Sequence, residues 1–277
     1  MKINNIYAAF FSPTGTTEKI VRAISGHLSD AWSVPLQAHD FTLPAARGEG
    51  LFFGRGSLAV IGVPTYAGRV PNVLLPYIQE KIRADGALAV PVAMFGNRAF
   101  DDALIELRDL LEQAGFRTVA AAAFVGEHSF SRTLAAGRPD EKDLAVAEAF
   151  AAAVASRVDA MQEAPSGPVS VSGHEPLRPY YKVFDTNGEP VSILKVKPKV
   201  SDACTRCGLC ARICPMGSID ASDVTAYTGI CIKCGACEKR CPVGARYYDD
   251  AGYLYHKQDL EARYARRAEP EIFASMP

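Results

Sequence analysis

The eight cysteines of the chain lie in two runs with identical spacing. Each run has the form C-x2-C-x2-C-x3-C followed by proline, and the second run begins 27 residues after the first. Three cysteines spaced in this way lie on one tight loop and reach three corners of a [4Fe–4S] cube, while the fourth ligand must arrive from elsewhere. The two runs therefore predict two [4Fe–4S] clusters, and with them a capacity to carry electrons.

The fourth cysteine of such a run ligates the cluster of the other run. Cluster one is thus expected to bind Cys204, Cys207, Cys210 and Cys241. Cluster two is expected to bind Cys231, Cys234, Cys237 and Cys214.

Structural zinc and disulfide bonds are the alternative uses of these cysteines. Structural zinc usually takes two separated C-x2-C pairs for each ion, which leaves the third cysteine of each run and the x3 step without a role. A disulfide framework suits short secreted chains, whereas this chain has 277 residues and shows no export signal. The spacing therefore favours clusters over both alternatives.

The segment from about Lys199 to Asp250 resembles a bacterial-type two-cluster ferredoxin. The resemblance rests on the two cysteine runs, each with glycine after its second cysteine and proline after its fourth. The segment departs from many small ferredoxins, which are acidic, because nine basic residues outnumber six acidic ones from Lys195 to Asp250. This formal charge of +3 would partly offset the anionic clusters and raise their potentials, or would dock an acidic partner. The sequence leaves both interpretations open.

The composition is that of a globular protein with more than one domain. Of the 277 residues 48% are hydrophobic, and the formal net charge is −1. This near-neutral charge gives no electrostatic reason to expect nucleic acid as a partner. The apolar start at residues 6–11 is too short for a signal peptide, and no stretch reaches the length of a membrane span. We therefore expect a soluble, cytoplasmic protein.

The first part of the chain alternates between strand patterns and helix patterns. Near-continuous apolar runs predict strands at residues 3–11, 57–63, 87–95 and 118–125, with a weaker one at 32–38. Helical patterns predict helices at 17–28, from about 71, at 99–114 and at 140–161. Apolar strands separated by helices indicate an α/β fold, a doubly wound parallel sheet covered on both faces.

The amino-acid composition changes after this alternating part. Residues 164–198 contain six prolines and an Asn187-Gly188 turn, which predicts a linker, and Tyr180, Tyr181 and Phe184 suggest that part of it packs. We expect a first domain at 1–163, a Pro-rich linker at 164–198, a smaller α+β cluster-binding domain at 199–250 and a C-terminal helical tail at 251–277. The helix of this tail is expected from His256 to Arg267.

Ligands of a doubly wound sheet bind beyond the carboxyl ends of its strands. The first loop at that edge, residues 12–17, reads Ser-Pro-Thr-Gly-Thr-Thr. Hydroxyls and free N–H groups at a helix N-terminus can hold an anion, although serine and threonine are also ordinary N-cap residues. The loop lacks both the Gly-Lys-Ser/Thr of a P-loop and the G-x-G-x-x-G of a dinucleotide fold. An uncharged, hydroxyl-rich loop fits the single phosphate of FMN.

The pattern [Ser/Thr]-x-Thr-Gly-x-Thr in this loop is that of the flavodoxin phosphate loop, and residues 1–160 resemble a flavodoxin in the order of their elements. The resemblance implies FMN contacts in three loops. They are Ser12, Thr14, Gly15, Thr16 and Thr17, then Pro64, Thr65, Tyr66, Ala67 and Gly68, and then Gly96, Asn97, Arg98 and Phe100. Tyr66 and Phe100 would stack on the flavin ring, and Arg98 would stabilise the anionic reduced flavin.

Several of these residues also have ordinary structural interpretations. Tyr66 could be a core tyrosine at the end of a strand, and Arg98 could cap a surface helix. His128 lies in a fourth loop at the same edge and could meet flavin or substrate, but a lone histidine is more often structural.

As a whole, the chain resembles the flavodoxin–ferredoxin fusion proteins of anaerobic bacteria and archaea. The resemblance implies an electron-transfer iron-sulfur flavoprotein that passes electrons between FMN and two [4Fe–4S] clusters. Two alternatives stay open. One is a flavin-dependent oxidoreductase that reduces a small molecule in a pocket shaped by Glu127, His128 and Arg98, and the other is a ferredoxin module on a flavin-free docking domain.

The sequence says less about partners. Redox proteins are the expected partners, but neither donor nor acceptor can be identified, and a homodimer stays open. No residue set for nucleophilic or hydrolytic catalysis is visible, and no nicotinamide motif is present.

Overall fold

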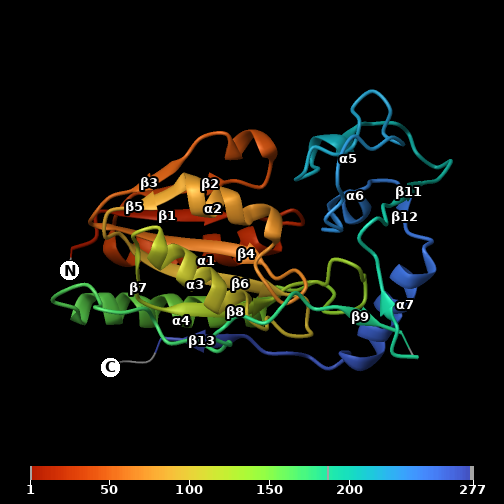
Figure 1. Cartoon of the computed structure of the whole chain (residues 1–277). Helices are drawn as coiled ribbons and strands as arrows, with labels where there is room; N and C mark the ends of the chain where they lie inside the picture. Colours follow the sequence, from red (N-terminus) through yellow and green to blue (C-terminus); the bar gives the residue numbers. More distant parts are fainter. Residues whose placement is uncertain (1, 186, 275–277) are drawn as a thin grey trace.

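The first part of the chain is built around one mostly parallel sheet in the computed structural model, which describes residues 2–185 and 187–274. The parallel strands are β1 (Asn5–Phe10), β2 (Leu36–Asp40), β4 (Ser57–Pro64), β6 (Leu88–Phe95) and β8 (Ala121–Val125). They lie side by side in the order β2-β1-β4-β6-β8 (Figure 1). This is the 2-1-3-4-5 order of flavodoxin-like folds, so the predicted α/β fold is confirmed.

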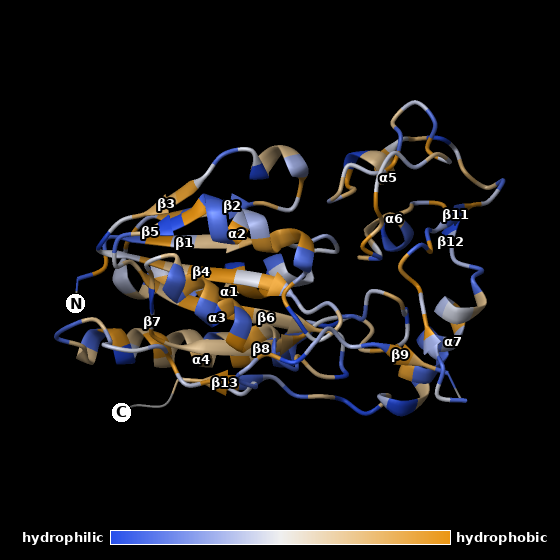
Figure 2. Ribbon diagram, viewed as in Figure 1, coloured by the Kyte–Doolittle hydropathy of each residue, from blue (hydrophilic) through white to orange (hydrophobic). Residues whose placement is uncertain are grey.

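Strands β4 and β6 form the centre of the sheet. Leu58 pairs with Leu88 and Val63 with Ala93, and both strands are buried along almost their whole length. Because they are covered on both faces, they need apolar residues on both, which explains their near-continuous apolar sequences. Figure 2 shows this hydrophobic centre between more polar helices.

Two pairs of helices cover the sheet. They are α1 (Thr16–Trp32) and α4 (Glu141–Ala160) on one face, and α2 (Leu75–Lys81) and α3 (Ala103–Gln113) on the other. Ile20 and Phe150 pack in the first core, and Ile78 and Leu107 in the second. Short elements complete this part: 3-10 helices at Pro44–Arg47 and Asn72–Leu74, the parallel pair β3 (Leu51–Phe53) and β5 (Ile82–Ala84), and β7 (Arg117–Thr118) beside β6. No helix in the described part of the chain is long and apolar enough to cross a membrane.

The cysteine-rich region, residues 199–250, repeats one backbone conformation at an interval of 27 residues. Arg206, Gly208 and Gly217 have φ angles of 54°, 72° and 59°. Lys233, Gly235 and Gly244 have φ angles of 55°, 77° and 62°. Helices α5 (Leu209–Arg212) and α6 (Ala236–Lys239) occupy equivalent places, and β11 (Lys199–Val200) pairs antiparallel with β12 (Arg246–Tyr247). The sequence repeat is therefore a repeat of structure as well.

The linker packs against the first domain through its middle. Arg178 donates a hydrogen bond to the buried carboxylate of Asp102 at 2.9 Å, and the hydroxyl of Tyr180 donates to the carbonyl of Val70 at 2.9 Å. Tyr181 lies under the guanidinium of Arg98. Further along, Phe184 is 52% exposed in the hairpin of β9 (Val183–Phe184) and β10 (Pro190–Val191). Part of the linker thus packs, as its aromatic residues suggested, but Phe184 does not take part.

The C-terminal segment returns to the first domain. Helix α7 (Ala251–Arg263) is capped by Asp250, whose carboxylate accepts a hydrogen bond from the N–H of Tyr253 at 2.9 Å. The chain then runs back along the sheet and forms β13 (Glu271–Phe273), which pairs antiparallel with β8 (Figure 1). The expected helical tail is therefore helical over α7 alone, because a short strand whose partner is distant in the sequence leaves no periodic pattern. Residue 1 of the expected first domain, residue 186 of the expected linker and residues 275–277 of the expected tail lie outside the described residues.

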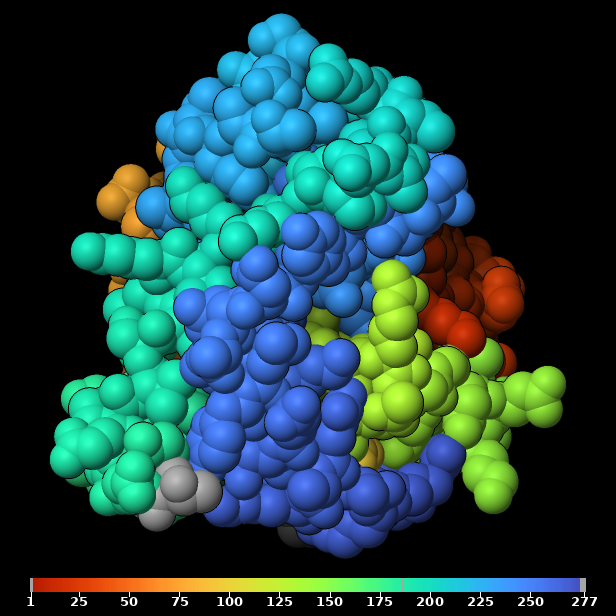
Figure 3. Space-filling model, turned by 90° about the vertical axis from the view of Figure 1, so that its right-hand side faces the viewer, coloured from red at the N-terminus to blue at the C-terminus, as the bar shows by residue number. Residues whose placement is uncertain are grey.

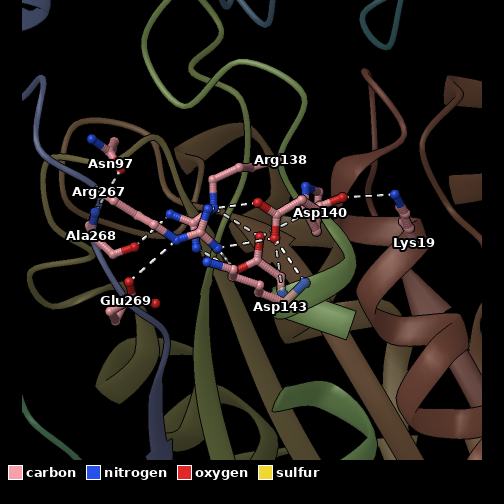
Figure 4. Close-up of polar contacts among 10 residues, drawn as sticks. Lys19, Asn97, Arg138, Asp140, Asp143, Arg267, Ala268 and Glu269 are labelled. Atoms are coloured by element: carbon pink, nitrogen blue, oxygen red, sulfur yellow. Dashed lines mark hydrogen bonds and ion pairs between the residues drawn. The ribbon is translucent and has the colours of Figure 1, made fainter. Parts of the chain in front are cut away.

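A cluster of charged residues holds the returning segment (Figure 4). Arg138 and Asp143 form a buried ion pair, and the Arg138 guanidinium also donates to the carbonyl of Ala268 at 2.5 Å. Arg267 pairs with Asp140 at 2.6 Å. Since Asp140 and Asp143 form the capping box at the start of α4, the N-terminus of this helix and the C-terminal segment share one network.

Candidate cofactor site

A pocket opens at the carboxyl edge of the sheet. Its empty space, which includes open solvent at its mouth, is about 440 Å³. It is lined by Pro13, Thr14, Thr16, Thr17, Pro64, Thr65, Tyr66, Met94, Phe95, Gly96, Gly126, Glu127, His128, Ser129 and Cys234. The three loops singled out from the sequence therefore converge, as parallel strands require. The cysteine-rich region supplies one further wall residue, Cys234.

The loop at residues 12–17 forms the start of α1 without a side-chain cap. Gly15 is the N-cap residue with φ 90°, a conformation that favours glycine. The Ser12 hydroxyl accepts a hydrogen bond from the N–H of Glu18 at 2.9 Å, and the Ser12 N–H donates to the Thr42 hydroxyl at 2.8 Å. Ser12 and Gly15 thus shape the loop, whereas Thr14, Thr16 and Thr17 line the pocket. The described lining holds no lysine or arginine, so it suits a phosphate bound by hydrogen bonds at a helix N-terminus.

Thr65 provides an independent sign that the pocket is built for a ligand. Its hydroxyl oxygen is buried and has no hydrogen-bond partner in the described structure. A buried polar group without a partner costs free energy, so a ligand group that pairs with it would be stabilised. Gly126 leaves space beside Thr16, because a Cβ there would lie 3.1 Å from Cβ of Thr16. The residues present therefore fit a polar, phosphate-bearing cofactor such as FMN.

Tyr66 occupies the pocket wall nearest to the cysteine-rich region. Burial, together with the nearby Cys234 and Cys231, raises its pKa well above the usual value, so the phenol stays neutral. Its backbone closes a tight turn with Arg69, through Tyr66 N–H to Arg69 O at 2.9 Å and Arg69 N–H to Tyr66 O at 3.2 Å. Ala67 and Gly68 form the tip of this turn with φ angles of 50° and 78°, and neither lines the pocket.

Three residues expected at the flavin ring contact other parts of the chain. The Asn97 amide donates to the carbonyls of Tyr264 and Arg266, both at 2.6 Å. Arg98 forms an ion pair with Asp101, and its guanidinium lies 4.4 Å from the ring centre of Tyr181. Phe100 is buried between Phe95 and Phe273. Only Gly96 of the third loop lines the pocket, because the returning C-terminal segment and the linker take up the other side chains.

The loop after β8 contributes more to the pocket than the sequence indicated. Gly126, Glu127, His128 and Ser129 all line it. The His128 Nδ1 atom accepts a hydrogen bond from the N–H of Phe130 at 3.1 Å, which leaves the proton of the neutral ring on Nε2. Burial lowers the pKa of His128 to about 3, so the ring is neutral at physiological pH. The position of these residues at the carboxyl end of a predicted strand, at the same edge as the other three loops, was the signal available in the sequence.

The cysteines surround two further cavities. One has an empty volume of about 330 Å³, and its cysteines are Cys204, Cys207, Cys210 and Cys241. The other has an empty volume of about 370 Å³, and its cysteines are Cys214, Cys231, Cys234 and Cys237. Each cavity thus gathers the cysteines of one expected ligand set. Within the described residues no three histidine, cysteine or acidic side chains are arranged to hold a single metal ion.

The surroundings of the sulfur atoms suit iron–sulfur clusters. Backbone N–H groups donate to Sγ of Cys204 and Cys231, each at 3.4 Å, and to Sγ of Cys241 at 3.2 Å. The Arg246 guanidinium donates to Sγ of Cys210 at 3.2 Å. Burial raises the pKa of Cys237 to about 12, and the charge of Arg246 opposes this shift. Hydrogen bonds to sulfur are also one of the means by which proteins tune cluster potentials.

The second cavity lies against the first domain. Lys239 of α6 forms an ion pair with Glu127, and Arg132 donates to the carbonyl of Glu238 at 2.9 Å. On the other side, Arg47 donates to the carbonyl of Pro215 at 2.6 Å. In Figure 3 the cysteine-rich region rests above the yellow-green loop that follows β8 and the blue segment of α7. None of the residues that line the first cavity takes part in these contacts, and its Cys207 is exposed.

Residues 203–245 match the family model described as 4Fe-4S dicluster domain. No curated protein sequence matches the chain. Among solved structures, the chain is similar to a flavodoxin from the domain Archaea, at 13% identity over 56% of this chain and 99% of that chain, with a TM-score of 0.41. It is also similar to a flavodoxin of Streptococcus pneumonia TIGR4, at 18% identity over 55% of this chain and 99% of that one, with a TM-score of 0.39. A third is rubredoxin oxygen:oxidoreductase from Desulfovibrio gigas, at 15% identity over 57% of this chain and 37% of that one, with a TM-score of 0.41.

The sheet order and the family match together define the class of the protein. The chain joins a flavodoxin-like domain to a 4Fe–4S dicluster domain, as the sequence predicted. Its architecture is therefore that of a flavodoxin plus ferredoxin fusion.

Proposed function

We propose that the protein binds one FMN and two [4Fe–4S] clusters and passes electrons between them within one chain. One observation carries this proposal: Cys234 lines both the pocket at the sheet edge and the second four-cysteine cavity. A single residue thus separates the two spaces. Electron transfer needs cofactors held at short distance rather than reacting side chains, and the shared lining residue supports such an arrangement.

The proposed flavin site uses residues of the first domain. Thr14, Thr16 and Thr17 with the N-terminus of α1 would hold the phosphate, and Thr65 would hydrogen-bond to the cofactor. Tyr66 would cover the side that faces Cys234. When bound, FMN supplies the exchange between two-electron and one-electron chemistry. The chain's own residues would orient it, exclude water and keep neutral groups beside it.

The proposed order of electron transfer follows from exposure. Cys207 of the first ligand set is exposed, whereas Cys234 of the second is 8% exposed and lies at the flavin pocket. Cluster one would therefore exchange electrons with external proteins, and cluster two would connect cluster one to the flavin.

A pair of cysteine variants tests the crossed ligand assignment on which this order rests. Cys210 and Cys214 belong to the same sequence run but line different cavities. We expect Cys210→Ser to impair cluster one and leave cluster two and the flavin intact. We expect Cys214→Ser to impair cluster two and to block flavin reduction through the clusters. Iron and flavin content, electron paramagnetic resonance and stopped-flow flavin bleaching would be measured; identical losses in both variants would contradict the crossed assignment.

The geometry favours this relay over a small-molecule reductase. Glu127 and His128 line the pocket, but two of the three residues that would shape a substrate site are engaged in ion pairs, Glu127 with Lys239 and Arg98 with Asp101. The third alternative, a flavin-free docking domain, is opposed by the buried Thr65 hydroxyl without a partner. Iron, acid-labile sulfide and flavin per chain, measured on anaerobically purified protein, decide between them. About eight iron and one FMN support the relay, and eight iron without flavin would support the docking domain.

A further inference from the structure

Two of the segments that line the first four-cysteine cavity are basic. Residues 203–215 and 240–246 contain four arginines and no acidic residue. Three of these arginines, Arg206, Arg212 and Arg240, are exposed, whereas Arg246 is buried and donates to Cys210 Sγ. One arginine therefore hydrogen-bonds to a cysteine of the cavity, and the other three are exposed to solvent in the segments that line it.

The three exposed arginines keep their charge available. None of them forms an ion pair within 4.0 Å among residues 2–185 and 187–274, unlike Lys239 and Lys199, which pair with Glu127 and Asp249. The Arg212 guanidinium donates to the carbonyl of Cys207 at 3.0 Å, which places its charge next to the exposed cysteine. Hydrogen bonds from Thr225 lower the pKa of the exposed Asp223, and the charge of Arg206 adds to this effect. We call these three arginines the rim of the first cavity; the described residues form no ion pair with them.

An exposed edge of the cavity lies inside this rim. Cys207 is exposed, Val243 is 44% exposed, and both line the cavity. Electron exchange between proteins needs close approach at such an edge, and a ring of unpaired charge around it steers a partner of opposite sign. Such transient redox contacts are small, on the order of 1,200 Å² or less in total.

We propose that this surface, made of Arg206, Arg212, Arg240 and Val243 around Cys207, docks a small acidic electron-carrier protein. The inference rests on the proposed relay, and it identifies the class of protein that would exchange electrons with cluster one. In the step itself, one electron crosses between the carrier and cluster one. The donor is oxidised by one electron and the acceptor reduced by one, and no bond forms or breaks.

The test uses the intact, cluster-loaded protein and two haem proteins as probes. The dithionite-reduced protein is mixed in a stopped-flow instrument with an acidic haem acceptor, cytochrome b5, or with a basic one, cytochrome c, at increasing salt. The variants are Arg206→Glu and Arg240→Glu. The control is Arg55→Glu, which makes the same change of charge at an exposed arginine before β4, at the opposite end of the strand from the pocket.

We expect each variant on the rim to slow cytochrome b5 reduction about tenfold at low salt, with the difference disappearing at high salt. Cytochrome c reduction should not slow, and Arg55→Glu should behave as the wild type. Equal rates in the rim variants and in Arg55→Glu would overturn the docking surface. So would a rate loss accompanied by a shifted cluster potential in redox titration, because the arginines would then act on the cluster rather than on the partner.

The same measurements separate the two proposals. A salt-dependent exchange with cytochrome b5 in a protein whose flavin is never reduced would leave the docking surface standing and remove the relay. Flavin reduction through the clusters without any effect of the rim variants would leave the relay standing and remove the docking surface.

Discussion

Lys239 of α6 forms an ion pair with Glu127 of the loop that follows β8. The pair is largely buried, since the Lys239 side chain is 10% exposed and that of Glu127 27%. Lys239 also donates to the carbonyl of Ser131 at 2.6 Å. Because Lys239 stands between Cys237 and Cys241 in the sequence, this one side chain ties the pocket wall to the segment that carries ligands of both expected clusters.

Replacing Lys239 with methionine should destabilise the contact between the domains. Glu127 would lose its partner in a desolvated place, which we expect to cost about 2 kcal/mol. Lys199→Met is the control, because its pair with Asp249 is exposed and should matter little. Anaerobic urea unfolding measures stability, and flavin reduction after dithionite addition measures the electron path. Equal effects of the two variants would refute the role of the pair.

Gly235 and Gly208 allow a matched test of the close approach between the domains. They occupy equivalent positions of the repeat, with φ angles of 77° and 72°. A Cβ on Gly235 would lie 2.5 Å from the backbone carbonyl oxygen of Ser129, whereas a Cβ on Gly208 would meet only the flexible end of Arg212, at 3.1 Å. Both alanine variants should carry backbone strain of about 1 kcal/mol. Gly235→Ala alone should also slow transfer between clusters and flavin, and similar transfer rates in both would contradict this.

His128 should make stability depend on pH. Its pKa is lowered by burial to about 3 in the folded state, against about 6.5 when unfolded. As the pH falls below 6.5 the unfolded chain takes up a proton and the folded one does not, so stability falls by about 1 kcal/mol by pH 5.5. His128→Asn should reduce this dependence of stability on pH, and His27→Asn, at an exposed site on α1, should leave it unchanged. Unfolding midpoints at pH 5.5 and 7.5 provide the measurement; unchanged slopes in both variants would argue against a neutral His128.

We expect the Asn97 side chain to hold the C-terminal segment in place and not to bind flavin. Its amide holds the carbonyls of Tyr264 and Arg266 and the N–H of Ala268, at 2.6, 2.6 and 3.1 Å. Asn97→Gly permits the same φ of 67° but removes these bonds, so we expect a loss of about 2 kcal/mol and faster proteolysis near residue 264. Ala135→Gly, at φ 53°, is the control for the glycine itself. Wild-type flavin affinity in Asn97→Gly would agree with this role, and a selective loss of flavin would contradict it.

The parts of the site that depend on local sequence could be predicted. Three loops at the ends of apolar strands meet at one edge because parallel strands must deliver them there, and Thr16, Thr65 and Gly96 do line the pocket. The cysteine sets likewise follow from spacing and from the crossing of the fourth ligand, and Cys214 and Cys241 lie in the cavities expected for them.

The parts that depend on distant segments could not be predicted. Asn97 and Phe100 have the residue types of flavin contacts, but β13 and the chain before it lie beside them and engage both. Nothing near Cys234 in the sequence indicates that it reaches the pocket of another domain. Such outcomes are decided by which segments pack together, and no spacing within one segment encodes that.

The return of β13 to the sheet changes how the two halves are joined. The first domain is completed by residues from both sides of the cysteine-rich region, so that region is topologically an insertion, attached by residues 164–198 at one end and by residues 264–270 at the other. A single proteolytic cut in the Pro-rich linker would leave the other attachment in place. The severed end would remain at an effective concentration in the millimolar range, so the cut protein should keep its electron path even at high dilution. The cysteine-rich region and the first domain are thus joined by two covalent connections, and cutting either one leaves them attached.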